Sequence, residues 1–316
     1  MPLSFYDRLS KRPEMFRSFT GLDVAEFDSL LSRTELAYDE HEKKRLSRRD
    51  RKHEIGAGRP FKLPLEDRLL MLLIYHRSYV TSILLGFTFN LDQSNVLKDI
   101  RMLEPLVKEC IPLPEKLHEM ARRARTFEEV ERYFPGFKAF VDATEQEIPR
   151  PKNSLKRKTH YSGKRKMHTV KTQLTVNSEG LIVHRTNHAR GRRNDLEIYR
   201  KHHPSLPKDV EQDFDRGYHG VRNYFPDLNC ATPFKQTSPG RGHRGEKAPA
   251  LTPEQKAYNK MLSNKMLSKA RVIVEHTISR VKKFNIFGTE FRNRLKHYDV
   301  MTDLVCGLVN FRILGA

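Results

Sequence analysis

Residues 138–145 read Lys-Ala-Phe-Val-Asp-Ala-Thr-Glu, a short apolar run followed at once by an acid, Asp142. Aromatic and β-branched residues favour a strand, so we predict a strand that ends by presenting this carboxylate. Two later acids have comparable settings. Asp215 lies in Gln-Asp-Phe-Asp-Arg-Gly-Tyr-His-Gly, at the carboxyl end of a strand expected between Val210 and Phe214, and Glu275 lies in the helical pattern Arg-Val-Ile-Val-Glu-His-Thr-Ile-Ser-Arg-Val-Lys.

The segments around this stretch predict an α/β fold. After the first strand we expect two strands, a helix, two more strands, a long helix and a last helix, at 169–176, 181–185, 196–202, 210–214, 230–234, 254–283 and 298–313. This order is that of an RNase H-like domain, a mixed sheet flanked by helices. In that arrangement the first strand, the fourth strand and a late helix converge, so the three acids share one site.

The segment before residue 115 is predicted to be all helical. A helix from Val24 is capped by Thr20 or Asp23, and residues 64–76 form a buried helix. A short helix within 79–89, a turn at Asn90-Leu91 and a helix opened by Asp92 follow, which is the layout of a helix-turn-helix. The polar residues on its outer face would read DNA: Gln93, Ser94, Asn95, Lys98 and Arg101. The alternative is an ordinary three-helix packing unit.

The predicted domain boundaries follow these patterns. We expect a helical and basic arm at 1–60, the helix-turn-helix domain at 61–115, a helical connector at 116–135, and the RNase H-like domain at 136–316. A Gly-, Pro- and Arg-rich stretch at 236–253 predicts a basic loop within the last domain.

The charge balance favours a polyanionic partner. Lys and Arg number 59 against 39 Asp and Glu in 316 residues, a formal net charge of +20, and neutralising phosphates releases counterions. We expect basic contacts to DNA from a hairpin at 150–168 and from the late helix: Lys156, Arg157, Lys158, Lys164, Arg165, Lys166, Arg271, Lys282 and Lys283. No apolar run of about 18 residues and no signal-peptide pattern is present, which predicts an intracellular, cytoplasmic protein without a membrane partner.

The three acids suit a hard divalent cation. Magnesium or manganese prefers oxygen ligands and leaves positions open for water and phosphate, and two such ions can serve both sides of a phosphoryl transfer. Three scattered cysteines, and histidines without a familiar zinc spacing, argue against a zinc site. Three carboxylates pressed together repel each other, so we expect the metal-free site to be destabilised or partly protonated.

The motifs resemble those of a known family. Val141-Asp-Ala-Thr-Glu145, Tyr161-Ser-Gly-Lys164 with His168-Thr-Val-Lys171, Asp215-Arg-Gly-Tyr218 and the segment 271–282 resemble the motif series of DDE transposases. The most similar group is the Harbinger-like set related to the fifth-numbered bacterial insertion-sequence family. The resemblance implies that Asp142, Asp215 and Glu275 are the catalytic and metal-binding triad. It also implies Mg²⁺ or Mn²⁺, two ions, double-stranded DNA ends and target, and a homodimer or larger complex on DNA, with no small-molecule substrate.

Alternatives stay open at this point. Asp213 and Asp195 compete with Asp215, and Asp195 is more simply a helix cap. Glu145 is an outer acid of the site or a surface residue, and Glu275 could pair with Arg271 on a solvated face. The rival functions are a transposase-derived DNA-binding regulator without catalysis and a metal-dependent endonuclease that does not join.

Overall fold

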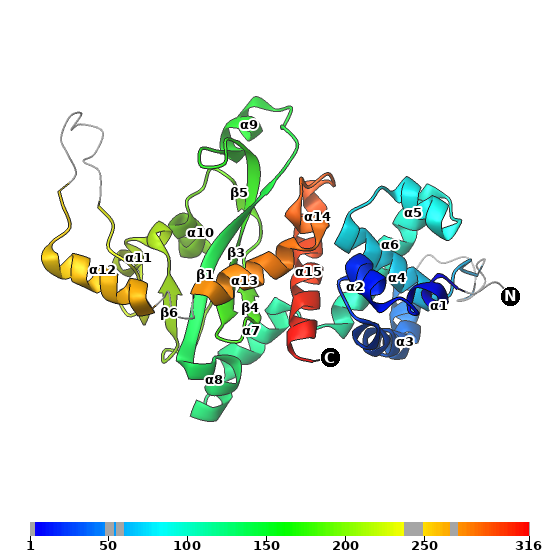
Figure 1. The fold of residues 1–316 in the computed structure, drawn as a ribbon, viewed down its shortest axis with the longest axis horizontal. Helices are drawn as coiled ribbons and strands as arrows, with labels where there is room; N and C mark the ends of the chain where they lie inside the picture. The colour runs from blue at the N-terminus through cyan, green and yellow to red at the C-terminus, as the bar shows by residue number, and fades with distance from the viewer. Residues whose placement is uncertain (1–3, 48–53, 55–59, 237–248, 266–270, 316) are drawn as a thin grey trace. The chain divides into compact units, whose positions relative to one another are not determined.

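The computed structural model describes residues 4–47, 54, 60–236, 249–265 and 271–315, and its elements are labelled in Figure 1. The chain divides into two compact units. The first comprises residues 1–113, 280–289 and 294–316, and the second comprises residues 114–279 and 290–293. The predicted domain boundaries stay predictions, and each unit is described by itself.

The first unit is helical. It contains α1 (Phe5–Leu9), α2 (Pro13–Thr20), α3 (Val24–Leu46), α4 (Leu65–Ser78), α5 (Ser82–Phe89), α6 (Gln93–Cys110), α14 (Asn285–Gly288) and α15 (Tyr298–Ile313). Asp23 caps α3, since its side chain accepts from the N–H of Glu26 while Glu26 accepts from the N–H of Asp23, a reciprocal capping box. Residues 69–76 of α4 are buried all round the helix, as the sequence predicted.

A buried ion pair joins two helices of this unit. Arg68 of α4 lies 3.4 Å from Asp99 of α6, with both side chains at most 10% exposed. The Arg68 guanidinium also lies over the ring of Phe61 and donates to the Tyr38 hydroxyl at 3.0 Å. Removal of one partner would strand a charge in the core, so this pair ties α6 to α4.

The second unit is a mixed sheet with helices. Its strands are β1 (Lys138–Glu147), β2 (Tyr161–Ser162), β3 (Met167–Asn177), β4 (Ile182–Arg185), β5 (Ala189–Arg190), β6 (Glu211–Phe214) and β7 (Cys230–Ala231). The strand order is β2-β3-β1-β6-β7, with β4 and β5 also paired to β3. β1 runs antiparallel to β3 and parallel to β6, and β6 runs parallel to β7. The predicted α/β, RNase H-like class is confirmed.

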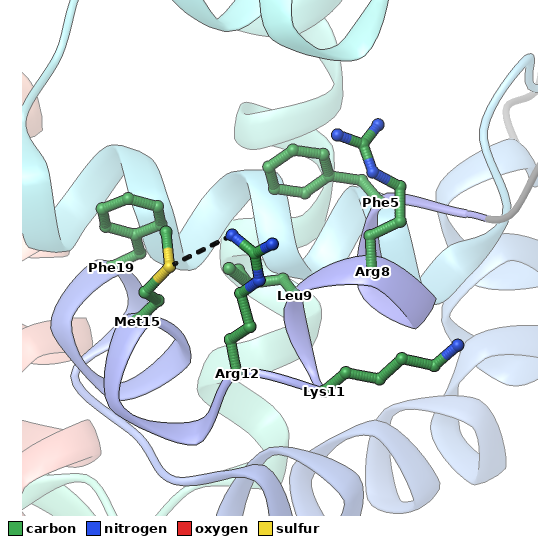
Figure 2. A pocket seen from close by; sticks show the side chains of 7 residues that line it. All are labelled: Phe5, Arg8, Leu9, Lys11, Arg12, Met15 and Phe19. Atoms are coloured by element: carbon green, nitrogen blue, oxygen red, sulfur yellow. Dashed lines mark hydrogen bonds between the residues drawn. The ribbon is translucent and has the colours of Figure 1, made fainter.

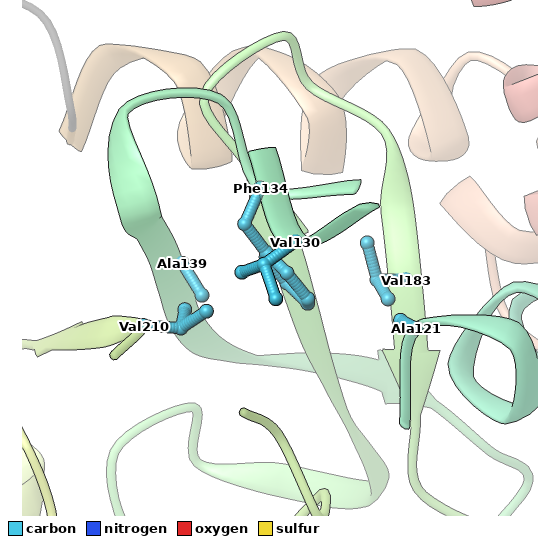
Figure 3. Packing of buried hydrophobic residues seen from close by; sticks show 6 residues of the cluster. All are labelled: Ala121, Val130, Phe134, Ala139, Val183 and Val210. Carbon is cyan, nitrogen blue, oxygen red and sulfur yellow. The ribbon is translucent and has the colours of Figure 1, made fainter. Parts of the chain in front are cut away.

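Helices cover this sheet. They are α7 (Pro114–Arg123), α8 (Phe127–Tyr133), α9 (Ser154–His160), α10 (Asp195–His202), α11 (Val221–Tyr224), α12 (Pro253–Lys265) and α13 (Arg271–Lys282), whose last three residues belong to the first unit. Figure 3 shows how α7 and α8 are anchored: Ala121 of α7, Val130 of α8 and Phe134 directly after α8 pack with Ala139 of β1, Val183 of β4 and Val210 directly before β6. Burial of the Phe134 side chain alone stabilises the folded unit by roughly 1.5–3 kcal/mol. The other five residues of the cluster are aliphatic.

Several predicted elements differ from the structure. The single connector helix at 116–132 is two helices, because Thr126 and Glu129 form a capping box that starts α8. The predicted helix at 254–283 is described as α12 and α13, and residues 266–270 lie outside the described part of the chain. Most of the predicted basic loop, 237–248, also lies outside it.

The basic segment at 150–168 is only partly a hairpin. Its first half forms α9, whose amino end is capped by Asn153 accepting from the N–H of Lys156, and only β2 and the start of β3 make the strand pair. The prediction of a hairpin throughout was wrong because the local asparagine cap favours a helical turn at residues 154–160.

Candidate functional site

Asp142 and Asp215 lie beside each other in the second unit. Val141 of β1 pairs with Phe214 of β6 in parallel register, so the next residue of each strand is one of the two acids. Asp142 is not at the end of its strand as predicted, because β1 continues for five residues to Glu147 through pairing with β3. Asp215 does follow the end of β6, as predicted.

Backbone N–H groups orient both carboxylates. The N–H of Ala143 donates to Oδ1 of Asp142 at 2.7 Å, and the N–H of Gly217 donates to Oδ1 of Asp215 at 2.8 Å. Asp215 thereby caps the short helical turn at Arg216–Tyr218. These bonds use one oxygen of each acid, which leaves acceptor capacity on both side chains.

The two acids are coupled electrostatically. Burial, together with the charges of Asp215 and Asp195, raises the pKa of Asp142 from 3.8 to about 6, although the N–H of Ala143 and the charge of Lys164 lower it. Burial and repulsion disfavour the ionised form of this carboxyl group, so a bound cation would stabilise it.

Glu275 lies on a helix, as the sequence pattern predicts. It lies on α13, whose residues Val274 and Ile278 are buried, and its own side chain is exposed. The helix is attached to the sheet side of the unit by Thr277, whose hydroxyl donates to the carbonyl of Gly180 at 3.1 Å. Within the part of the chain that the structure describes, no three His, Cys, Asp or Glu side chains are arranged to hold a metal ion. Glu275 is therefore not gathered with the two aspartates here.

Asp195 lies closer to the pair than the sequence indicated. Asn194, and not Asp195, caps α10, since its side chain accepts from the N–H of Glu197 at 2.7 Å. Asp195 is the first helical residue, and a Cβ built on Gly217 would stand 2.9 Å from Oδ1 of Asp215 and 3.2 Å from Oδ2 of Asp195. Both carboxylates thus border the same glycine, which leaves no space there for a side chain.

A buried lysine, Lys171, forms ion pairs with Asp195 and Glu145. Nζ of Lys171 lies 3.0 Å from Oδ1 of Asp195 and 3.4 Å from Oε1 of Glu145. The side chain of Lys171 is 10% exposed and that of Glu145 is 9% exposed. Glu145 is therefore buried in an ion pair with Lys171. It is neither a surface residue nor a neighbour of the Asp142 carboxylate.

Strand alternation puts these residues on two faces. Glu145 pairs directly with Lys171, and Asp142 pairs with Leu174. Directly opposed residues share a face and successive residues alternate, so Asp142 and Glu145 lie on opposite faces of β1. Val141, on the Glu145 face, packs with Tyr199 of α10, so that face is the one covered by α10.

The buried side chains of Gln173 and Tyr218 connect the segments that carry Asp195 and Asp215. The amide of Gln173 donates to the Tyr218 hydroxyl at 2.6 Å and to the carbonyl of Asp195 at 3.3 Å. Tyr218 is fully buried, and burial with the charges of Asp195, Asp142 and Asp215 raises its pKa. The phenol therefore stays neutral and holds the loop after Asp215 in place.

The basic residues predicted around the site are exposed in part. Lys156, Lys158, Lys164, Arg165 and Lys166 are exposed and Arg157 is partly buried. The charge of Lys164, in the turn between β2 and β3, lowers the pKa of Asp142. Of the others, Lys282 is partly buried and Lys283 is exposed in the first unit, and the side chain of Arg271 lies outside the described residues.

The helix-turn-helix is formed in the first unit. α5 and α6 are joined by a tight turn in which Asn90 adopts a left-handed conformation, and Asp92 caps α6 by accepting from the N–H of Ser94. The five residues predicted to read DNA are all exposed on α6. Gln93 also donates to the hydroxyl of Ser82 at 2.9 Å, which ties the start of α6 to α5.

Gly86 makes this turn possible. The N–H of Leu91 donates to the carbonyl of Gly86 at 2.8 Å, and a Cβ on Gly86 would stand 2.7 Å from the carbonyl oxygen of Leu91. The turn thus lies directly against the glycine. Any side chain here would push α5 and α6 apart.

A basic hollow of about 370 Å³ lies at α1 and α2 (Figure 2). Arg8, Lys11 and Arg12 line it together with apolar side chains, and Figure 2 shows Arg12 reaching toward Met15, whose sulfur lies 3.8 Å from Nη1. Among the described residues that line the hollow, the three charged side chains are all basic, so its charge favours an anion.

Sequence reasoning missed Lys171 and the proximity of Asp195. A lysine inside an otherwise apolar and threonine-rich strand was the available signal, because buried lysines are rare unless paired. The partner could not be identified without the strand register. A cation fits the pair of aspartates, since carboxylate oxygens suit a hard divalent ion and Asp142 carries a raised pKa that such an ion would relieve.

No helix within the described ranges is long and apolar enough to cross a membrane.

Two family models match the chain. The model described as DDE superfamily endonuclease matches residues 141–310, and that described as helix-turn-helix of DDE superfamily endonuclease matches residues 61–113. A protein of Microchaete diplosiphon, described as a probable transposase for insertion sequence element IS702, is 28% identical over 268 residues, which are 84% of this chain and 86% of that protein.

Proposed function

The chain belongs to the DDE superfamily endonucleases and is a transposase with a helix-turn-helix DNA-binding region, and on this premise we propose that Asp142, Asp215 and Glu275 are the acids with which it cuts and rejoins DNA. The resemblance predicted from the motifs is confirmed. The observation that carries the proposal is the parallel register of Val141 with Phe214, which sets Asp142 and Asp215 side by side.

Endonucleases of this superfamily use divalent metal ions. Asp142 and Asp215 would hold the ion, and Glu275 would complete the set from α13. The oxygen donors favour Mg²⁺ or Mn²⁺, and two ions are proposed because both the attacking and the leaving oxygen need stabilisation. When bound, the ions supply Lewis-acid stabilisation of charge on the phosphate and lower the pKa of bound water.

The proposed reaction has two steps. Water attacks the phosphodiester at the end of an insertion sequence and frees a 3′ hydroxyl, which then attacks a phosphodiester of target DNA. Each step exchanges one P–O bond for another, so no oxidant and no covalent protein intermediate is needed. Lys164, whose charge lowers the pKa of Asp142, would pair with a phosphate of the bound strand, and Lys156, Lys158, Arg165 and Lys166 would follow the backbone.

DNA ends would be recognised by the first unit. The exposed amino end of α6 presents Gln93, Ser94 and Asn95 to base edges, and Lys98 and Arg101 to phosphates or guanines. Because two ends of one element must be joined in a single event, we propose that at least two copies of the chain assemble on DNA. The substrate places the enzyme with the chromosome, in the cytoplasm and on the nucleoid.

The test is single-turnover cutting of a labelled DNA end with Mg²⁺ or Mn²⁺. Asp142→Asn, Asp215→Asn and Glu275→Gln should each lose at least about 10³-fold in rate, because each removes a ligand charge while leaving a side chain of similar size. Asp227→Asn, which changes an exposed acid of the same unit, is the matched control. Full cutting by Glu275→Gln would remove Glu275 from the triad, and tight end binding without any cutting by the unaltered protein would favour a regulator.

A further inference from the structure

Lys171 is a buried charged residue without a role in the proposed cutting reaction. It lies on β3 and ends between two carboxylates, Asp195 at 3.0 Å and Glu145 at 3.4 Å. Buried lysines are held only where their charge is paired, because desolvation of the ammonium group is costly. Two of the three charged groups in this cluster, Lys171 and Glu145, are buried, and Asp195 is partly exposed, so the arrangement needs a reason.

Asp195 is the member of this cluster that could interfere with the site. Its carboxylate borders Gly217 together with that of Asp215, and its charge reaches Asp142. A third carboxylate beside this pair would compete for a bound cation, or would add ligand oxygens in the wrong geometry. In the structure the ammonium group of Lys171 is paired with this carboxylate.

The direction in which Lys171 holds Asp195 follows from the register. Lys171, Glu145 and Gln173 share the face of the sheet that is covered by α10, whereas Asp142 lies on the other face. Gln173 holds the backbone carbonyl of Asp195 on the same α10 face, at 3.3 Å. Glu145 is held in turn by Thr169, whose hydroxyl donates to Oε2 at 2.9 Å, so the lysine is anchored on both sides.

We propose that Lys171 is a positioning residue of the cutting site: it holds the carboxylate of Asp195 on the α10 face of the sheet, outside the set of oxygens that receives the divalent cation. The inference rests on the proposed function. It explains why an acid so near Asp142 and Asp215 is not one of the triad. It also gives Glu145, next to Asp142 in the motif, the role of anchoring the lysine.

The inference predicts an unusual response to Lys171→Met. Asp195 loses its partner and becomes available to the cation, so the variant should bind Mn²⁺ at least about fivefold tighter, because one more uncompensated negative charge faces the ion. It should nevertheless cut DNA at least about tenfold more slowly, since the added ligand distorts the arrangement of oxygens. A residue of purely structural value would weaken cation binding and cutting together.

Second-site changes identify the carboxylate concerned. Adding Asp195→Asn to Lys171→Met should return the Mn²⁺ affinity to within about threefold of the unaltered protein, because the released carboxylate is gone. Adding Glu145→Gln instead should leave the affinity raised, since Glu145 is not the acid that turns toward the ion. Lys201→Met, which removes an exposed lysine 3.3 Å from Glu197 on the same helix, is the matched control and should change neither quantity.

The measurement is calorimetric titration of the full-length protein with Mn²⁺, without DNA, alongside single-turnover cutting. Asp195→Asn alone keeps Lys171 paired with Glu145 and serves if Lys171→Met does not fold. That variant should keep its Mn²⁺ affinity within about tenfold, whereas removal of a ligand costs more than that.

Two sets of results are separable. A folded Lys171→Met with unchanged or weaker Mn²⁺ binding, a second-site Asp195→Asn that does not reverse the effect, or a loss of more than about tenfold in Asp195→Asn alone overturns the inference. Retention of full Mn²⁺ affinity by Asp142→Asn, or no Mn²⁺ binding by the unaltered protein, overturns the proposed function instead.

Discussion

Asp142→Asn should make the metal-free protein more stable at neutral pH. Burial and the charge of Asp215 raise the pKa of Asp142 from 3.8 to about 6. The folded protein therefore binds a proton at this position more tightly than the unfolded chain does. Between pH 3.8 and pH 6 the unfolded chain ionises at this position while the folded protein keeps its proton, so stability falls as the pH rises. Above pH 6 both states are ionised and the full penalty applies.

The magnitude follows from the shift. About two pKa units at ~1.36 kcal/mol per unit give roughly 3 kcal/mol of stability lost at pH 7.5 and regained below pH 4. Asparagine removes the charge and keeps an oxygen that can accept from the N–H of Ala143. We therefore expect the free energy of unfolding to rise by about 2–3 kcal/mol at pH 7.5 with EDTA, and by nothing at pH 3.5.

The assay is urea unfolding of the full-length protein at both pH values, with the exposed Asp227→Asn as control. With Mg²⁺ at about 100 times its dissociation constant the unaltered protein should gain about 2.7 kcal/mol, and Asp142→Asn should gain almost none. An Asp142→Asn protein that is equally or less stable than the unaltered protein at pH 7.5 in EDTA would refute the electrostatic account of the site.

Three further predictions concern DNA. Gly86→Val should lower stability by about 1–3 kcal/mol and abolish binding of DNA ends, measured by thermal unfolding and gel shift, because the side chain meets the carbonyl of Leu91; unchanged binding would contradict the helix-turn-helix geometry. Asn95→Ala should cost about 1–3 kcal/mol on the end sequence alone, whereas Lys98→Ala should weaken all sequences and reduce the salt slope by about one, as titrations at several salt concentrations would show. Lys164→Ala removes a charge that lowers the pKa of Asp142, so the acid limb of the cutting rate should move to higher pH; a shift to lower pH would show that Lys164 acts elsewhere.

The strand order and the pairing of Asp142 with Asp215 were within reach of the sequence. An apolar run before Asp142 and the segment 210–214 before Asp215 predict the strands, and the order of strands and helices predicts which of them lie side by side. The length of β1 was not predictable in this way. Beyond Asp142 the strand continues through Thr144 and Gln146, which are buried polar residues, so the hydrophobic signal stops while the pairing with β3 goes on.

Local caps explain other differences. Thr126 with Glu129, and Asn153, are ordinary helix-start signals that lay within charged segments and were overlooked. Asp195 next to Asn194 was an ambiguous pair, and only the backbone geometry shows that Asn194 is the cap. The position of Glu275 depends on contacts between segments distant in sequence, for which no local pattern exists.

The most direct test of the central claim is joining. A labelled DNA that carries the flanking terminal repeats is incubated with a target plasmid and either Mg²⁺ or EDTA, using the unaltered protein and Asp142→Asn at equal DNA occupancy. The account predicts plasmid joined to the labelled 3′ end only with Mg²⁺ and only with Asp142 present. Joining by Asp142→Asn, or joining in EDTA, would contradict it.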